Sequence, residues 1–186
     1  EFCKNVKHNG KPRKYLEINS SSVKSLTGLV EKVFQPHVID REISVLFDEA
    51  HSLPKEVQMF LLTVLNTERT PMRQIPYGDS ILEFAFLRQS IHFATTEPQG
   101  IFKPLKSRMD IQALDTYTNE QLQKVIQLNV PDVDFEDDVL EHVAGSVKGT
   151  PRSCVQMADK IADYCSIKGR KSFDLGDFHN LQKMAN

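Results

Sequence analysis

One run of apolar residues, which ends in two adjacent carboxylates, strongly limits the folds that this chain can adopt. The run begins at Ile43 and passes through Val45, Leu46 and Phe47 to Asp48 and Glu49. A continuous apolar stretch of this length suits a strand buried on both faces, as in the parallel sheet of an α/β protein. Such a sheet binds ligands at the carboxyl ends of its strands, so we expect the two acids at a ligand site.

Two carboxylates in this position suit nucleotide hydrolysis. In nucleotide-hydrolysing enzymes the first acid holds Mg²⁺, directly or through water, and the second polarises the attacking water. The pattern alone is weak, because two acids at a strand end are most often solvated side chains. The rest of the sequence must therefore decide between a nucleotide site and a solvated strand end.

The first part of the chain alternates between strand and helix patterns. The expected elements are strand 15–19, helix 23–34, strand 43–48, a helix opening near Pro54, strand 90–95, helix 101–106 and strand 109–114. Pro36 is expected to end the first helix. A turn at 77–80 between two extended arms predicts a β-hairpin inserted before the third strand. The alternation predicts an α/β fold with a parallel sheet and flanking helices.

From Thr118 onward the pattern becomes helical, which predicts a domain boundary. We expect an α/β domain at 1–115 and a small all-helical domain at 116–186. The expected helix starts are a capping box at Thr118 to Gln121, a cap within Asp134 to Asp137, Thr150 with Pro151, and Asp174.

Composition narrows the range of partners. The chain has 186 residues, 40% of them hydrophobic, and a net charge of −2, which gives no global electrostatic footprint for nucleic acid. The local basic clusters at 11–14 and 168–171 are candidates for phosphate contact, but more simply form solvated faces. Three scattered cysteines, Cys3, Cys154 and Cys165, favour a reducing compartment. With no signal-peptide or membrane-span pattern, we expect a cytoplasmic protein.

Three further polar residues suit phosphate chemistry. Thr96 follows the 90–95 strand and is placed to hydrogen-bond a γ-phosphate or the attacking water. Arg108 lies on a loop after a short helix, where its guanidinium can reach out of its own subunit and stabilise a transferring phosphoryl group. Arg152 lies in the first turn of a helix, where the helix dipole disfavours a positive charge unless a phosphate offsets it. Taken singly, each is more simply a cap or a solvated side chain.

In their order along the chain, these residues resemble the motifs of the AAA+ ATPases, most closely the RuvB-like Holliday-junction branch-migration motors. The matching stretches are 46–53 for Walker B, 93–100 for sensor 1, 104–108 for the arginine finger and 149–152 for sensor 2. The resemblance covers nearly the whole chain. It implies a partial AAA+ large subdomain, with a hairpin insertion before sensor 1, followed by a helical lid subdomain.

The resemblance implies an ATP site with a Mg²⁺ ion. Asp48 would position the metal, and Glu49 would activate the attacking water. Thr96 would sense the γ-phosphate, with Thr95 beside it at the nucleotide. The cofactors expected are therefore ATP and Mg²⁺.

The resemblance also implies an assembly. Arg108 would reach the nucleotide of a neighbouring subunit in a homo-oligomeric ring, with a hexamer as the expected size, and Arg152 would couple the lid to the phosphates. DNA would be bound through segments outside this chain. The hairpin within Thr70 to Phe86 would contact a protein partner. The expected process is ATP-driven branch migration in DNA recombination and repair.

The chain departs from the family pattern in several places. It contains no Gly-x-x-x-x-Gly-Lys-Ser/Thr stretch, so the phosphate-binding P-loop and its lysine are missing from the sequence. Met109 follows Arg108 where the family usually has Phe, and the 186 residues end before the winged-helix domain that the resemblance leads us to expect beyond the lid. The stretch 1–6 reads as the second half of a helix. We expect the chain to be part of a longer protein, and to be inactive alone.

Three alternatives stay open. Asp48 to His51 also matches the DEAH box of superfamily 2 helicases, although that class needs a second RecA-like domain. A clamp-loader or helicase-loader subunit shares Walker B, sensor 1 and the Ser-Arg finger. A P-loop-less AAA+ scaffold is the non-enzymatic alternative, and the retention of Glu49, Thr96, Arg108 and Arg152 argues against it.

Overall fold

The structure is a computed structural model. It describes residues 7–8, 10–65, 72–77, 80–86, 88–136, 138–147 and 149–184. The helix end predicted at 1–6 and the hairpin turn residues Gly78 and Asp79 lie outside the described residues. The chain divides into two compact units, Glu1–Ile111 and Gln112–Asn186. The sequence pattern predicts the boundary between residues 115 and 116.

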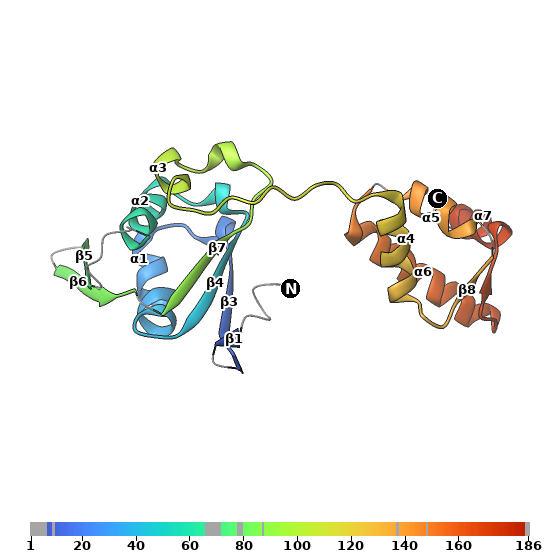
Figure 1. The fold of residues 1–186 in the computed structure, drawn as a ribbon, viewed down its shortest axis with the longest axis horizontal. Helices are drawn as coiled ribbons and strands as arrows, with labels where there is room; N and C mark the ends of the chain where they lie inside the picture. Colours follow the sequence, from blue (N-terminus) through green and yellow to red (C-terminus); the bar gives the residue numbers. More distant parts are fainter. Residues whose placement is uncertain are drawn as a thin grey trace. The chain divides into compact units, whose positions relative to one another are not determined.

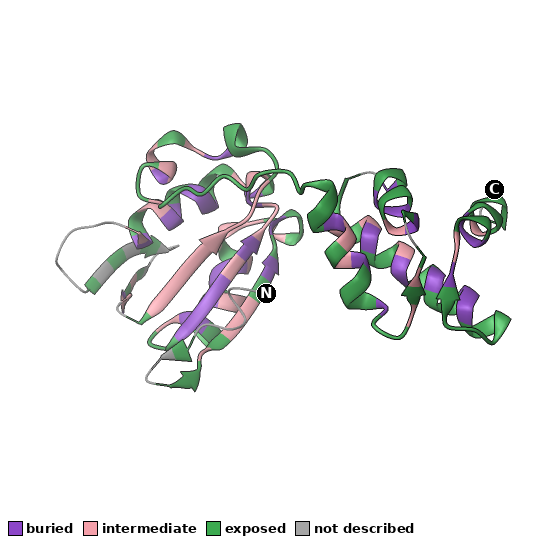
Figure 2. Cartoon of the chain, turned by 45° about the vertical axis from the view of Figure 1, so that its right-hand side comes forward, coloured by how far each residue is buried: buried purple, intermediate pink, exposed green. Residues whose placement is uncertain are grey.

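The first unit is built on a three-stranded parallel sheet. Its strands are β3 (Lys14–Asn19), β4 (Ile43–Asp48) and β7 (Gln89–Phe93), in the order β3-β4-β7, with β4 in the centre (Figure 1). Val45 is paired with Leu16 on one side and Ile91 on the other. The parallel sheet predicted from the apolar run is therefore confirmed, and the run is its most buried strand (Figure 2).

Helices cover this sheet with apolar side chains. They are α1 (Leu26–Leu29), the π-helical η3 (Val30–Val38), α2 (Lys55–Val64) and α3 (Lys103–Lys106). Phe34 of η3 and Phe60 of α2 meet edge to face with ring centroids 5.1 Å apart, in the same core as Phe47 of β4. This core fixes the position of β4, and with it the acids at the end of the strand.

Pro36 does not end its helix, so that prediction was wrong. The helical segment continues to Val38, and the Ile39 N–H donates to the Phe34 carbonyl five residues earlier. The wider spacing of π-helical bonds, together with full burial of Phe34 and Val38, accommodates a residue that lacks a donor. Ser25 caps α1 by accepting from the Gly28 N–H at 3.1 Å.

The hairpin prediction is confirmed, whereas the last predicted strand is not found. β5 (Met72–Tyr77) pairs antiparallel with β6 (Ser80–Ala85) before β7. Residues 109–114 are not a strand, because no strand among the described residues pairs with them. Two of their apolar side chains are exposed, 64% for Ile111 and 94% for Leu114.

The second unit is helical apart from one short parallel pair. Its elements are α4 (Asn119–Asn129), β8 (Asp134–Phe135), α5 (Val139–Ser146), α6 (Pro151–Lys168), β9 (Ser172–Phe173) and α7 (Leu175–Met184). The predicted capping box at Thr118 is present, Thr150 caps α6 with Pro151 in its first turn, and Gly169 ends α6 with a φ of 66°. Ile126, Val143, Ile161 and Phe173 are fully buried in its core.

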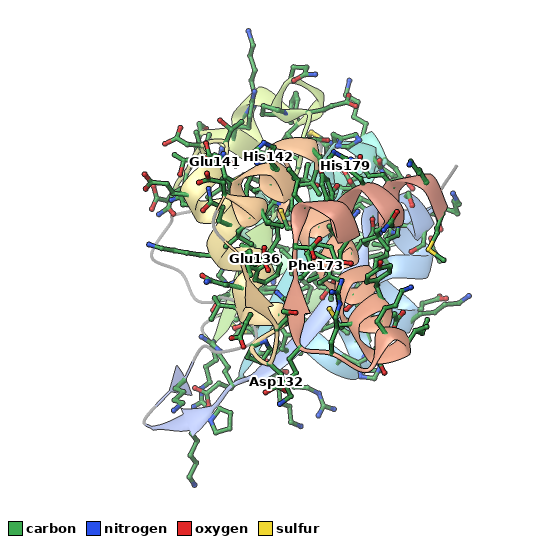
Figure 3. All side chains as sticks on the ribbon, turned by 90° about the vertical axis from the view of Figure 1, so that its right-hand side faces the viewer. Asp132, Glu136, Glu141, His142, Phe173 and His179 are labelled. Atoms are coloured by element: carbon green, nitrogen blue, oxygen red, sulfur yellow. The ribbon has the colours of Figure 1, made fainter. Side chains whose placement is uncertain are left out.

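The second helix of this unit begins later than predicted. Asp134 and Phe135 form β8 instead of capping it, and α5 starts after Asp138. The reason is tertiary: Asp134 N–H donates to the Lys171 carbonyl, and Phe135 packs edge to face on Phe173. Glu136 follows, and its N–H donates to the Phe173 carbonyl (Figure 3). No helix within the described ranges is long and apolar enough to cross a membrane.

Candidate functional site

The two acids lie at the carboxyl end of the central strand. Asp48 is the last residue of β4 and is paired in register with Asn19, the last residue of β3. Glu49 follows with a φ of 51°, in the left-handed region that a non-glycine residue adopts only in special turns. The Asp48 carboxylate accepts from the Glu49 N–H at 3.0 Å. The turn thus directs two neighbouring carboxylates away from the strand.

Backbone hydrogen bonds join this turn to the loop after β7. The Ala50 N–H donates to the Ala94 carbonyl, and the Ala94 N–H donates to the Phe47 carbonyl, both at 2.9 Å. Thr95 and Thr96 come directly after Ala94. The parallel pairing of β4 with β7 therefore brings the predicted acids and the predicted threonines to the same edge of the sheet.

The two threonines differ in their surroundings. The Thr95 hydroxyl is engaged within the site, because its Oγ1 lies 2.9 Å from His51 Nδ1 and accepts from the Glu97 N–H at 3.0 Å. Thr96 is exposed at the mouth of the loop. A ligand at this edge can therefore reach the Thr96 side chain, whereas Thr95 mainly holds the loop together.

His51 also lies at this edge of the sheet, although the sequence motifs predict no catalytic or binding role for it. It lies on the 3₁₀ turn η4 (Ala50–Ser52), and besides contacting Thr95 its Nδ1 lies 3.5 Å from Glu49 Oε2. Its Nε2 lies 3.9 Å from Glu97 Oε1. A histidine two residues after a strand-end acid was the signal for this role, but its partners on the β7 loop are 44 and 46 residues away in sequence.

Arg108 lies beyond α3 in the same unit. Its Nη1 donates to the Pro104 carbonyl at 3.0 Å, and the side chain is exposed. No carboxylate among the described residues forms an ion pair with it, so its charge is free to meet an external anion. Leu105, fully buried, anchors the short helix that carries it.

Arg152 belongs to the second unit. It is exposed in the first turn of α6, immediately before Ser153, whose N–H donates to the capping Thr150 hydroxyl at 3.2 Å. The first unit therefore assembles Asp48, Glu49, Thr95 and Thr96 at one edge and presents Arg108 beyond it. The second unit contributes Arg152.

The donor set suits Mg²⁺ bound mainly by water and phosphate. No group of three or more metal-ligating side chains was found in the part of the chain that the structure describes. Mg²⁺ commonly takes only one or two protein carboxylates and completes its shell with water and substrate phosphates. Asp48, a single half-exposed carboxylate at the strand end, fits that mode of binding.

Comparisons with known proteins point to one group. No family model matches the chain. It is 28% identical over 134 residues to the Holliday junction branch migration complex subunit RuvB of Thermotoga petrophila, which covers 69% of the chain and 40% of that protein. It is 25% identical over 143 residues to RuvB of Limosilactobacillus reuteri, which covers 70% of the chain and 40% of the relative. The chain thus spans well under half the length of these curated relatives.

Solved structures agree with the sequence comparison. A Thermotoga maritima RuvB P216G mutant superposes with a TM-score of 0.75 at 19% identity over 92% of the chain and 54% of that structure. The Thermotoga maritima RuvB Holliday junction branch migration motor gives 0.72 at 20% identity, covering 92% of the chain and 53% of that structure. The predicted resemblance is confirmed: the chain is RuvB-like in sequence and has a partial AAA+ fold.

Proposed function

We propose that the chain is the catalytic and lid part of a RuvB-like AAA+ ATPase that moves DNA junctions through ATP hydrolysis at the subunit interfaces of a ring. The observation that carries this proposal is the joining of the acid turn to the β7 loop. The Ala50–Ala94 and Ala94–Phe47 bonds hold two carboxylates and an exposed threonine at one sheet edge. The similarity to RuvB favours this function over a clamp loader.

In this proposal the residues at the edge divide the chemistry. When bound, Mg²⁺ neutralises phosphate charge, and Asp48 is the residue that holds it. Glu49 accepts hydrogen bonds from the attacking water and orients it towards the γ-phosphate. The Thr96 hydroxyl donates a hydrogen bond to the γ-phosphate or binds the attacking water. The proposal is supported by the accessibility of these side chains at the strand ends, where Asp48 and Glu49 are half-buried and Thr96 is exposed.

Two arginines complete the proposed site. Arg108, which has no carboxylate partner within the described residues, stabilises the charge that develops on the phosphate of a neighbouring subunit. Arg152 links the lid to the phosphates of its own subunit. Hydrolysis also needs the lysine of a phosphate-binding P-loop, and no stretch of the 186 residues matches the P-loop motif. The chain alone is therefore expected to bind nucleotide poorly.

The hairpin is the proposed surface for a protein partner. Its described part exposes two apolar side chains, Met72 on β5 and Ile81 on β6, at 47% and 67%. These exposed side chains are the observation that supports a docking role for the hairpin. Ile81→Asp is expected to abolish partner-stimulated hydrolysis and to leave the basal rate unchanged.

Glu49→Gln tests the proposed function in the longer polypeptide that carries a phosphate-binding loop. Glutamine keeps the size of the side chain but orients water poorly, so turnover should fall by about 10²-fold or more while ATP binding is retained. Glu120→Gln, a matched change at an exposed acid in the second unit, should leave the rate unchanged. Turnover retained in Glu49→Gln would refute the role of Glu49.

A further inference from the structure

One buried amide stands out in the core of the first unit. Gln58 lies on α2 between the fully buried Val57 and the buried Phe60, and only 6% of its surface is exposed. A side-chain amide in such surroundings is unfavourable unless all its polar atoms find partners. Its hydrogen bonds therefore show what this residue does.

The Gln58 amide binds three backbone groups on two separate segments of the chain. Its Nε2 donates to the Leu53 carbonyl at 3.0 Å and makes a long contact of 3.5 Å with the Gly100 carbonyl. Its Oε1 accepts from the Phe102 N–H at 2.7 Å. Both donors and the acceptor are thus used, and none of the partners lies on α2. A residue that served only its own helix would not need these bonds.

These segments connect the acid turn to the arginine. Leu53 directly follows η4, the turn that begins after Glu49. Gly100 ends the turn η5 (Pro98–Gly100), and its backbone packs so closely on His51 that an added Cβ would lie 2.8 Å from the His51 Cβ. Gln58 therefore holds the end of the acid turn and the chain after sensor 1 in one fixed arrangement.

From Phe102 the connection continues to Arg108 through short backbone bonds. The Phe102 carbonyl accepts from the Leu105 and Lys106 N–H groups, which makes Phe102 the start of α3. The Arg108 N–H in turn donates to the Leu105 carbonyl at 3.1 Å. A displacement of Phe102 therefore moves α3 and the arginine that follows it.

We propose that Gln58 is a positioning residue that couples a subunit's own nucleotide site to the arginine it offers to the next subunit. Movement of the acid turn at Leu53 shifts the Gln58 amide, and the amide carries Phe102 and α3 with it, because breaking any of its bonds leaves a buried polar group unpaired. This inference rests on the proposed function, in which Glu49 acts in its own subunit and Arg108 acts in the neighbouring one.

Rings that mix variant and wild-type subunits distinguish the effect of Gln58 on its own subunit's nucleotide site from its effect on the Arg108 offered to the neighbour. Subunits that carry Glu49→Gln cannot hydrolyse ATP themselves but still present Arg108 to a wild-type neighbour. Adding Gln58→Met to such a subunit removes all three hydrogen bonds at similar side-chain volume. We expect wild-type neighbours to turn over roughly ten to a hundred times more slowly beside the double variant than beside Glu49→Gln alone, as for a misplaced catalytic group.

Two controls make the result decisive. Glu49→Gln with Arg108→Ala sets the full loss in the neighbour, and Glu49→Gln with Gln127→Met, at an exposed glutamine of α4, should equal Glu49→Gln alone. Thermal melting checks that the subunits are folded. If Gln58→Met fails to fold, Gln58→Asn replaces it, since its neutral amide is one methylene too short to keep the bonds to both Leu53 and Phe102.

The possible outcomes are distinct. Slow neighbours beside the Gln58 variants, approaching the Arg108→Ala level, support the coupling. Neighbours that run as fast beside the Gln58 variants as beside Glu49→Gln, while Arg108→Ala slows them, overturn it and leave the proposed function intact. If Arg108→Ala itself has no effect on neighbours, the action of Arg108 in the next subunit is wrong and the coupling falls with it.

Discussion

The imidazole of His51 lies 2.9 Å from the hydroxyl of Thr95, and this contact joins the turn after β4 to the loop after β7 through side chains as well as backbone. The same ring nitrogen lies 3.5 Å from the Glu49 carboxylate. A single side chain thus touches both the proposed base and the proposed sensor loop. Its removal should loosen both.

His51→Leu is therefore expected to lower the free energy of unfolding of the chain by about 1 kcal/mol, the typical loss for one partly buried hydrogen bond. His51→Asn should recover part of that loss, because the asparagine amide can place a polar atom near the position of Nδ1. Urea unfolding followed by circular dichroism measures both. His179→Leu, at an exposed position on α7, is the control and should change little.

The contact between Gly100 and His51 gives a second prediction. Because the atom facing an added Cβ at 2.8 Å is the His51 Cβ, which moves only with its backbone, Gly100→Ala should cost about 1–3 kcal/mol. Gly145→Ala is the matched control: nothing lies within 4 Å of an added Cβ there, and the residue is helical. It should stabilise the chain by about 0.5–1 kcal/mol. Equal effects of the two changes would contradict the predicted close packing.

The pH dependence of stability is expected to report on His92. Burial, and secondarily the nearby Arg13 guanidinium, lower the pKa of His92 below its ordinary value of 6.5. Below pH 6.5 the unfolded chain therefore binds the proton more readily than the folded chain, so the free energy of unfolding falls as the pH is lowered from that value. Above it His92 is neutral in both states and contributes no slope.

His92→Gln should flatten this dependence on the acid side. Unfolding measured in urea at a series of pH values tests it, with His37→Gln, at an exposed histidine, as the comparison. A slope that is the same in His92→Gln and in the wild-type chain would show that other groups determine the acid sensitivity.

In the second unit, the buried Asp177 carboxylate joins several elements and gives a further prediction. It is only 4% exposed, accepts from the Tyr164 hydroxyl at 3.0 Å and from the Asp174 N–H at 3.1 Å, and pairs with Arg170. Asp177→Asn removes the charge that Arg170 neutralises and replaces an acceptor by a donor, so it should cost about 2 kcal/mol. Hydrogen exchange should report this as lost protection in α7, with α2 in the first unit unaffected. Asp159→Asn, an exposed acid on α6, should have no such effect.

Local sequence patterns predicted the framework of the site well. β4 could be predicted because it is buried on both faces, which removes the alternation of an ordinary strand, and its acids necessarily follow it. The hairpin and the Thr118 capping box also depend on neighbours within a few residues. For such elements, local chemistry decides the outcome.

The features that local patterns predicted wrongly or missed all depend on contacts between residues far apart in sequence. Residues 109–114 have strand-forming side chains, but a strand also needs a hydrogen-bonding neighbour, which a local pattern does not reveal. Gln58 looks like an ordinary polar residue on a helix until Phe102, 44 positions away, is placed beside it. His51 likewise contacts Thr95 and Glu97, which lie 44 and 46 positions away in sequence. Tertiary contacts, and not propensity, determine what these residues do.

At Glu49 the left-handed backbone lowers the stability of the chain, whereas the proposed activity requires the glutamate side chain. A glutamate with a φ of 51° gives up roughly 1–2 kcal/mol relative to ordinary backbone, whereas asparagine adopts this conformation more readily. Glu49→Asn should therefore fold at least as stably as the wild-type chain although it lacks the proposed base. Selection for stability alone would drive the glutamate out of this turn, so any pressure that retains it there has to come from chemistry.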